Sequence, residues 1–261
     1  MSTTTGSFSE RIQPLLHSQP TPLVMRFLRA AGRGINHHTM FTDGDRVLLS
    51  VSGGKDSLAL ALALRLRLRF IPISYSLEAV MIDWREYPHD PAALQRIRDY
   101  FALLEIPFTV VVADMQPESF GGRFDCYRCG RNRRRILFDL VRSWSGVPLI
   151  ATGHHLDDIV QTTLMNLFLR GSFSTMVPVQ PFFEGALRVI RPLCEVPEEL
   201  IRTITRELAL PVSGIDCPFR TVNVRTRIAP IIEEAARINP QVRHSIYRAH
   251  TNIDHDYLPS L

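Results

Sequence analysis

Hydrophobic residues along the chain gather in short apolar runs that alternate with longer stretches of mixed polarity. The runs are bounded by turn-forming residues, as buried strands are, and lie at 47–51, 77–83, 108–113, 148–152 and 187–190. The stretches between and after them carry helix-forming residues, and we predict helices at 22–31, 58–70, 91–104, about 126–143, after 153 up to 169, at 197–208, about 222–237 and about 240–250. This alternation predicts an α/β fold, a Rossmann-like parallel sheet of about five strands flanked by helices, with right-handed crossovers.

One stretch has the period of a strand but the composition of a helix. From Leu58 to Phe70, apolar residues alternate with Ala or Arg. Leu, Ala and Arg are strong helix formers, and no β-branched residue appears until Ile71. We predict a helix here, because a buried helix tolerates leucines on all its sides.

The two ends of the chain differ from its middle. Residues 1 to about 20 are predicted to be a flexible lead. Residues 32–44 have a loop-like composition, and His37 and His38 within them are interpreted as surface or packing residues. We therefore divide the chain into an N-terminal extension with a short helix, an α/β domain and a C-terminal helical extension packed on that domain, at 1–40, 41–220 and 221–261.

A phosphate-binding loop is indicated where the first strand ends. The strand runs into Ser52-Gly53-Gly54-Lys55-Asp56-Ser57, and the helix follows directly. Glycine lets the backbone turn sharply and approach a ligand closely, and a helix N-terminus directs N–H groups at an anion. A Walker A loop is excluded because Leu49 occupies the place of its first glycine, and the dinucleotide fingerprint G-x-G-x-x-G is absent.

Composition narrows the class of protein further. The 261 residues carry a net charge of +4, and Lys55 is the only lysine among 30 Lys and Arg residues. An acidic partner such as RNA is compatible with this charge. The longest apolar run, 58–64, is too short to span a membrane, and the N-terminus lacks the apolar segment of a signal peptide, so we expect a cytoplasmic location and no membrane.

The four cysteines favour metal binding or catalysis over disulfides. Cys126 and Cys129 form a C-x-x-C pair at the start of a helix, and this pair alone suits zinc, iron–sulfur or redox chemistry. Cys217 lies far downstream. Cys194 is interpreted as a small buried apolar residue, although a role as a fourth ligand stays open.

Several of these polar segments follow strand ends. The Ser52–Ser57 loop, the C-x-x-C pair and the Gly153-His154 segment each come after a predicted strand, and Asp83 is the last residue of one. Because ligands of parallel sheets bind at the carboxyl ends of the strands, we expect these segments to meet on one rim.

Together the motifs resemble those of the TtcA/TtuA family of tRNA thiolases, and more closely its TtcA branch, which makes 2-thiocytidine in tRNA. The resemblance covers roughly residues 40 to 235 and rests on Ser52–Ser57, Cys126-x-x-Cys129 with the Arg134–Leu137 run, Gly153-His154-x-x-Asp157-Asp158, Arg191-Pro192-Leu193 and Cys217. It departs from the family at Arg128, where a leucine is common, and in having a single downstream cysteine.

The resemblance implies the ATP pyrophosphatase (PP-loop) fold and a reaction in which ATP activates a tRNA base for thiolation. It implies a [4Fe-4S] cluster on Cys126, Cys129 and Cys217. It further implies ATP binding by Ser52, Gly53, Gly54, Lys55, Asp56, Ser57, Asp83, Gly153 and His154. Candidate Mg²⁺ ligands are Asp56, Asp157 and Asp158, and candidate catalytic residues are Asp157, Arg133 and Lys55.

The expected partners are tRNA, a sulfur donor (a cysteine desulfurase persulfide or free sulfide) and a second copy of the chain in a homodimer. The basic surface for tRNA is assigned to Arg131–Arg135, Arg220, Arg225, Arg227, Arg243 and Arg248. Two other functions stay open: a PP-loop pyrophosphatase with structural zinc, acting on another tRNA base or a small molecule, and a non-catalytic RNA-binding or Fe–S protein.

Overall fold

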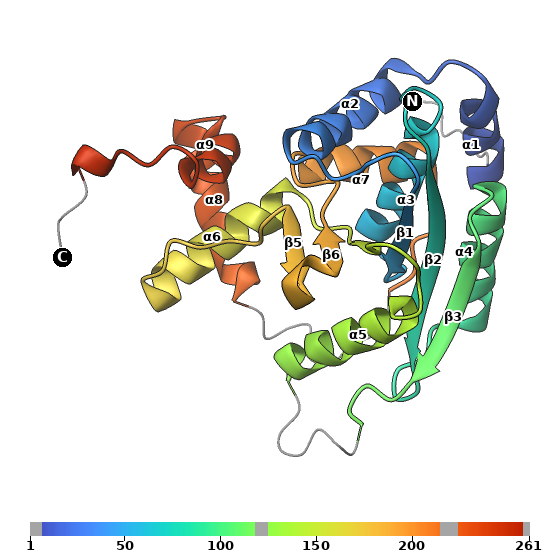
Figure 1. Cartoon of the computed structure of the whole chain (residues 1–261). Coiled ribbons are helices and arrows are strands. Elements are labelled where there is room, and N and C mark those ends of the chain that lie inside the picture. The colour runs from blue at the N-terminus through green and yellow to red at the C-terminus, as the bar shows by residue number, and fades with distance from the viewer. Residues whose placement is uncertain (1–6, 118–124, 215–223, 258–261) are drawn as a thin grey trace.

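The computed structural model describes residues 7–117, 125–214 and 224–257, which are built around one six-stranded sheet (Figure 1). The strand order is β3-β2-β1-β4-β6-β5. The strands are β1 (Asp45–Val51), β2 (Tyr75–Trp84), β3 (Phe108–Ala113), β4 (Leu149–Ala151), β5 (Val179–Phe182) and β6 (Leu187–Ile190). The helices are α1 (Phe8–His17), α2 (Pro22–His37), α3 (Lys55–Arg67), α4 (Pro91–Leu103), α5 (Cys126–Val141), α6 (Leu156–Arg170), α7 (Glu198–Glu207), α8 (Arg225–Ile238) and α9 (Val242–Ala249), with the 3₁₀ turns η1 (Phe183–Gly185) and η2 (His255–Tyr257).

The predicted α/β fold is confirmed, and the sheet is parallel except at one edge. β1 pairs in parallel with β2 and β4, β2 with β3, and β4 with β6. The edge strand β5 is antiparallel to β6, and we did not predict it. Its four residues include Gln180 and Pro181, so the segment lacks the apolar run that marks the other strands.

The strands bury both faces, which explains their nearly continuous apolar sequences. Val47, Leu49 and Val51 of β1 point into a large core that helices α2, α3, α4 and α7 share. Leu48 points to the other face, where α5 covers it with Leu137. The two faces together exclude water from the sheet that carries the loops.

The prediction of a helix from Leu58 onward is confirmed. Residues from Ser57 to Leu64 are all buried, and so is Leu66. The helix lies between β1 on one side and α2 and α7 on the other, so apolar residues are needed around its whole circumference. The alternation of leucine with Ala or Arg therefore does not indicate a strand, because both sets of positions lie on a helix that is buried on most sides.

The N-terminal region is more ordered than we predicted. The flexible lead is wrong for α1, which starts with a capping box between Ser7 and Glu10 and buries Ile12, Leu15 and Leu16 in the main core. The loop predicted at 32–44 is also wrong in part, because α2 continues to His37. The interpretation of His37 and His38 as packing residues is consistent with their hydrogen bonds to Glu195 and Tyr247.

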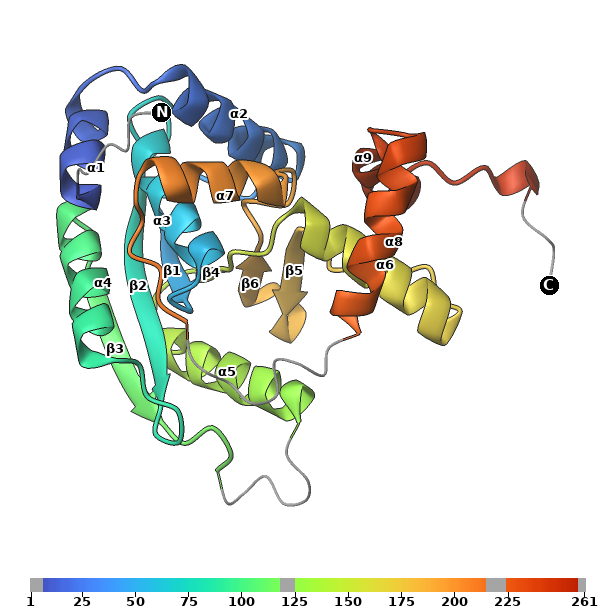
Figure 2. The ribbon, with the colours of Figure 1, turned by 180° about the vertical axis from the view of Figure 1, so that it is seen from behind.

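Helices α8 and α9 pack along α6 at one end of the molecule, as the two opposite views show (Figures 1 and 2). Their bounds agree with the predicted C-terminal helices to within a few residues. In the described ranges, no helix has the length and apolar character needed to cross a membrane.

Candidate active site

The loop after β1 has the shape that its glycines predict. Gly53 has φ +76°, a left-handed conformation, and a side chain there would meet the Ser213 carbonyl oxygen at 2.8 Å. The Ser213 N–H in turn donates to the Gly53 carbonyl at 2.9 Å. Inside the loop, Ser57 Oγ accepts from the Ser52 N–H (3.2 Å) and donates to the Gly54 carbonyl (2.9 Å). The loop is thus held in a curled form that leads into α3.

The loop after β4 lies directly against the first turn of α3. A Cβ atom on Gly153 would come within 2.9 Å of the Asp56 carbonyl carbon and of the Ser57 nitrogen. Only glycine allows this approach without displacing backbone. Because β1 and β4 are neighbours from which the chain continues in opposite directions across the sheet, this is the topological switch point where α/β sheets bind ligands.

Lys55 is held by two carboxylates. Its Nζ lies 3.0 Å from Asp56 Oδ1 and 3.0 Å from Glu198 Oε1, and Glu198 also accepts from Arg202. Burial alone would lower the pKa of Lys55, but the two carboxylates outweigh it and raise the pKa above its usual value. Lys55 is therefore a permanent cation at the start of α3.

A pocket of about 390 Å³ opens beside these loops. It collects side chains from the loops after β1 and β4, from the first turn of α6, from β6 and from α5. Its lining is Ser50, Ser52, Asp56, Ser57, Gly130, Arg133, Arg134, Leu137, Phe138, Ile150, Thr152, Gly153, His154, Asp158, Val189 and Arg191. Basic residues and helix N-termini in one concave site suit a phosphorylated ligand, and we call it the phosphate pocket.

Two basic residues of the phosphate pocket have strongly shifted pKa values. Burial lowers the pKa of His154 to about 4, and the charges of Arg191 and Arg225 act in the same direction, so His154 is neutral at pH 7. Its Nδ1 shares a 2.9 Å hydrogen bond with Thr152 Oγ1. Burial lowers the pKa of Arg191 to about 10, which still leaves it charged, and its guanidinium donates to Val177 O and to Gln180 Oε1.

Two of the three candidate Mg²⁺ ligands lie in this pocket. Asp56 and Asp158 both line it, and the buried His155 ring lies between them, with its Nε2 3.6 Å and 3.5 Å from their carboxylates. In the part of the chain described, Asp56 Oδ1 is buried and accepts no hydrogen bond, although Lys55 Nζ is near. Oxygen donors of this kind suit Mg²⁺.

Asp157 has different surroundings from Asp158. It is 8% exposed, its Oδ2 accepts the Glu198 N–H at 2.8 Å, and its Oδ1 accepts Arg243 Nε at 2.7 Å. It thereby caps α7 and ties α9 to α6, outside the phosphate pocket. Asp157 thus lies outside the phosphate pocket, although its Oδ2 is 3.8 Å from His155 Nδ1, and its predicted roles in catalysis and Mg²⁺ binding stay predictions.

The C-x-x-C pair lies at the start of α5, where Asp125 Oδ1 caps the helix through the Arg128 N–H. Cys126 is exposed and Cys129 partly buried. Thiols one turn apart at the start of a helix have a spacing that fits a metal cluster. Cys217 lies outside the described residues, and in 7–117, 125–214 and 224–257 no group of three His, Cys, Asp or Glu side chains is arranged to hold a metal ion.

Cys194 lies elsewhere in the fold, as interpreted from the sequence. It is fully buried, and burial raises the pKa of its thiol to about 12. Its Sγ is 3.6 Å from the Tyr247 hydroxyl of α9, and a side chain on Gly34 of α2 would meet it at 2.7 Å. Cys194 is a packing residue between α2 and α9, which argues against its use as a fourth ligand.

Asp83 lies near the carboxyl end of β2, as predicted, but does not line the phosphate pocket. Its Oδ1 accepts hydrogen bonds from the backbone N–H (2.9 Å) and the ring Nδ1 (2.7 Å) of the buried His89. A side chain on Gly53 would lie 3.5 Å from His89 Nε2, so the Asp83–His89 pair borders the loop from the β2 side. The resemblance implies that Asp83 takes part in ATP binding, and this role stays a prediction.

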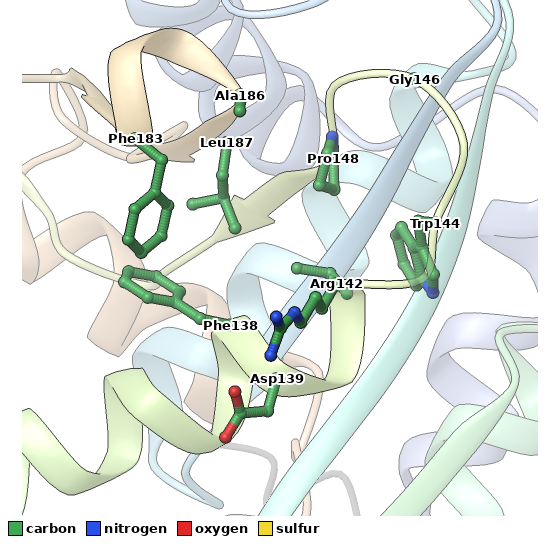
Figure 3. Close-up of a pocket in the computed structure, with 10 residues that line it drawn as sticks. Phe138, Asp139, Arg142, Trp144, Gly146, Pro148, Phe183, Ala186 and Leu187 are labelled. Carbon is green, nitrogen blue, oxygen red and sulfur yellow. The ribbon is translucent and has the colours of Figure 1, made fainter.

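A second pocket, of about 550 Å³, lies at the other end of α5. Phe138 and Phe183 face each other at one side and Trp144 lies at the other, with Arg142 between them (Figure 3). Pro148 and the first residue of β6 place this pocket at the amino ends of the strands, opposite the phosphate pocket. It is therefore not the site that the motifs predict.

Three contributors to the site escaped the sequence reasoning. Glu198 of α7 contacts Lys55, and Arg225 of α8 contacts Asp158, each from a helix far along the chain. His155, which contacts Asp158, was an unspecified position in the motif that begins at Gly153. Glu198 and Arg225 each begin a helix, but helix starts are common and none shows which loop it faces. Arg191 belonged to a quoted motif without an assigned role.

Comparisons with known proteins agree with this geometry. The family model described as a PP-loop domain matches residues 27–211. Proteins named tRNA-cytidine(32) 2-sulfurtransferase are similar along most of the chain. The one from Geobacter sulfurreducens is 34% identical over 236 residues, which are 89% of this chain and 91% of that protein, and the one from Bdellovibrio bacteriovorus is 31% identical over 237 residues, 89% and 90% of the two.

The match over most of its length shows that the chain belongs to the PP-loop proteins, in the TtcA/TtuA family of tRNA thiolases. Among solved structures, the U34-tRNA thiolase NcsA from Methanococcus maripaludis with its [4Fe-4S] cluster shares the fold, with a TM-score of 0.71 and 22% identity over 91% of this chain and 80% of that one. The resemblance drawn from the motifs is confirmed.

Proposed function

We propose that this chain is an ATP-dependent tRNA sulfurtransferase that adenylates the C2 carbonyl of a tRNA cytidine and replaces its oxygen with sulfur. One helix carries the proposal. α5 begins at Cys126 and Cys129, and about two turns later Arg133 and Arg134 line the phosphate pocket. The cysteine end and the phosphate end of the site thus share a rigid element, and the names of the relatives support tRNA cytidine as the substrate.

The phosphate pocket supplies the groups that adenylation needs. The backbone N–H groups of Gly53 to Ser57 and the ammonium of Lys55 hold the pyrophosphate that leaves, and Ser52 and Ser57 add hydroxyls. Asp56 and Asp158 would hold Mg²⁺, which neutralises phosphate charge. Gly153 permits the α-phosphate to approach, and neutral His154 offers it a hydrogen bond.

Arg133 stabilises the charge that develops during the transfer. The C2 carbonyl oxygen of the cytidine attacks the α-phosphorus, the bond to pyrophosphate breaks, and negative charge grows on the phosphate oxygens. Arg133 lines the pocket from α5, where Trp84 lies 5.8 Å from its guanidinium. Sulfide then bonds to C2, and the oxygen leaves with AMP.

The cysteines bring the sulfur. Cys126, Cys129 and Cys217 would hold a [4Fe-4S] cluster, which supplies an open iron for sulfide. The thiols of Cys126 and Cys129 lie one turn apart at the start of α5, and this spacing fits the role.

Anaerobic purification with iron, zinc and sulfide analysis tests the cysteine assignment. We expect a brown protein with about four irons and four sulfides. The colour should disappear in Cys126→Ala and Cys217→Ala but persist in Cys194→Ala, the matched control at a buried cysteine. A colourless protein with one zinc, or loss of the cluster in Cys194→Ala alone, would contradict the proposal.

Turnover on tRNA tests the reaction itself. With unmodified tRNA, ATP and sulfide, we expect AMP release and 2-thiocytidine in the digested nucleosides, and neither product with Lys55→Ala. AMP formation that does not depend on tRNA would favour a pyrophosphatase with another acceptor.

The basic surface proposed for tRNA consists of arginines, and two of these are paired with carboxylates in the structure. Arg225 and Arg243 are paired with Asp158 and Asp157. Arg220 lies outside the described residues, whereas Arg131, Arg134, Arg135, Arg227 and Arg248 are exposed. The sulfur donor, the homodimer and the cytoplasmic location stay predictions.

A further inference from the structure

Each aspartate in the first turn of α6 is paired with an arginine from the C-terminal helices. Arg225 Nη1 lies 3.2 Å from Asp158 Oδ1, and Arg243 Nε lies 2.7 Å from Asp157 Oδ1. Helices α8 and α9 both pack against α6 (Figure 2), and each contributes one of these two arginines. The C-terminal helices therefore extend to the edge of the phosphate pocket.

The two pairs differ in what surrounds them. In the Asp157–Arg243 pair each residue has a further partner: Asp157 also caps α7, and Arg243 also bonds Glu233. Asp158 lines the phosphate pocket. Its Oδ2 accepts the His155 N–H at 3.1 Å within the capping box of α6, so Arg225 is bound to the other oxygen. The second pair thus borders the phosphate pocket, whereas the Asp157–Arg243 pair lines a neighbouring cavity of about 460 Å³ between α6, α7, α8 and α9.

We propose that Arg225 is a ligand of the ATP phosphates, held by Asp158 in the nucleotide-free protein and transferred to the phosphates when ATP binds. The proposal rests on the proposed function only in taking ATP as the substrate. A triphosphate beside Asp158 repels its carboxylate and attracts the guanidinium that neutralises it. A guanidinium matches phosphate oxygens with paired N–H donors, so the exchange keeps Arg225 paired throughout.

Lys55, a second cation of this site, is also paired with carboxylates in the nucleotide-free protein. Its ammonium is shared between Asp56 and Glu198, and Glu198 keeps Arg202 as a second partner if Lys55 moves to a phosphate. Asp158 likewise keeps the His155 N–H when Arg225 leaves. Departure of Arg225 also exposes the Asp158 oxygen that a divalent cation would need.

Nucleotide binding by calorimetry tests the proposal without any turnover. The ligands are ATP with Mg²⁺ and adenosine, and the proteins are the wild type, Arg225→Ala, Arg225→Lys and Arg237→Ala. Arg237 is the matched control because it lies on α8, exposed and paired only locally with Glu234. We expect Arg225→Ala to lower the affinity for ATP about tenfold or more and the affinity for adenosine less than twofold. Lysine should restore part of the loss, and Arg237→Ala should change nothing.

The contrast between ligands separates phosphate binding from a structural role. Equal weakening of ATP and adenosine by Arg225→Ala, or ATP affinity equal to that of the wild type, would overturn the proposal. Arg225→Gln, which keeps a hydrogen bond to Asp158, replaces Arg225→Ala if that variant does not fold. A wild-type protein that binds adenosine but not ATP would overturn the proposed function as well.

A double-mutant cycle without Mg²⁺ tests the exchange directly. If Asp158 competes with ATP for Arg225, Asp158→Asn should bind metal-free ATP more tightly than the wild type does. Part of that gain comes from removing a negative charge, and this part persists in an Arg225→Ala background. The part due to competition must vanish there. A gain of the same size in both backgrounds would refute the exchange.

Discussion

Substitution of Gly153 by alanine tests the close contact on which the phosphate pocket depends. The added methyl carbon would lie 2.9 Å from the Asp56 carbonyl carbon and the Ser57 nitrogen, and 3.0 Å from the Asp56 carbonyl oxygen. All three are backbone atoms at the start of α3, so no side chain can move away. Since carbon atoms pack at about 3.5–4.0 Å, the two loops must separate by roughly half an ångström or more.

Separation of the loops has a cost in stability and a larger cost in binding. Overpacking of this kind costs about 1–3 kcal/mol in the free energy of unfolding. For a chain of this size that corresponds to a fall in Tm of roughly 2–12 °C. The effect on ATP binding should be larger than the effect on stability. A displacement of about 1 Å in a binding site can already cost roughly 100-fold in reaction rate. We expect at least a tenfold loss of ATP affinity in a protein that is still folded.

Thermal unfolding and calorimetry on the same preparation measure both effects. The matched control for the Tm is Gly130→Ala on α5, where a Cβ atom meets nothing within 4 Å. Gly130 lines the phosphate pocket, so this variant controls for stability and not for ATP affinity. Alanine inside a helix should leave the Tm unchanged or raise it. A Gly153→Ala protein with wild-type Tm and wild-type ATP affinity would refute the inferred contact between the two loops.

Three further predictions concern single side chains. The folded pKa of His154 is about 4, below the unfolded value near 6.5, so its share of the stability is complete above pH 6.5 and is lost as the pH falls toward 4. The free energy of unfolding, measured in urea, should fall between pH 7 and pH 5 by about 2 kcal/mol less in His154→Gln than in the wild type. Asp157→Ala should cost about 3 kcal/mol in urea unfolding because it leaves Arg243 without its buried partner, whereas wild-type stability with lost ATP turnover would favour the catalytic role instead. Mass spectrometry after alkylation of the folded apoprotein should find Cys126 modified and Cys194 intact, and rapid labelling of Cys194 would contradict its burial.

Local signals in the sequence were sufficient for most elements of the fold. Apolar runs bounded by turns identified five of the six strands, because strands buried on both faces need uninterrupted apolar residues. Strand β5 is the edge strand of the sheet and includes Pro181, so the uninterrupted apolar run is missing from its sequence. Helix α1 was missed because its ten residues begin close to the Ser/Thr-rich start of the chain, and the Ser7–Glu10 capping box that marks its beginning was not recognised in the sequence.

Motif spacing predicted which loops meet but not how side chains divide their work. Asp157 and Asp158 are adjacent, and the sequence offers no means of telling them apart. Helical geometry turns consecutive side chains by about 100°, so one faces α7 and α9 and the other faces the phosphate pocket. The same limit applied to Arg225 and Arg227, which were assigned together to the tRNA surface although only Arg227 is exposed.

The C-terminal helices have a part in the site that the family match alone does not include. The PP-loop model ends at residue 211, yet the acid pair that begins α6 is neutralised by Arg225 and Arg243 from beyond that point. Tyr247 of α9 also contacts Cys194 in the main core. A buried aspartate without a cation is costly, so the packing of α8 and α9 on α6 is a condition for the geometry of the phosphate pocket.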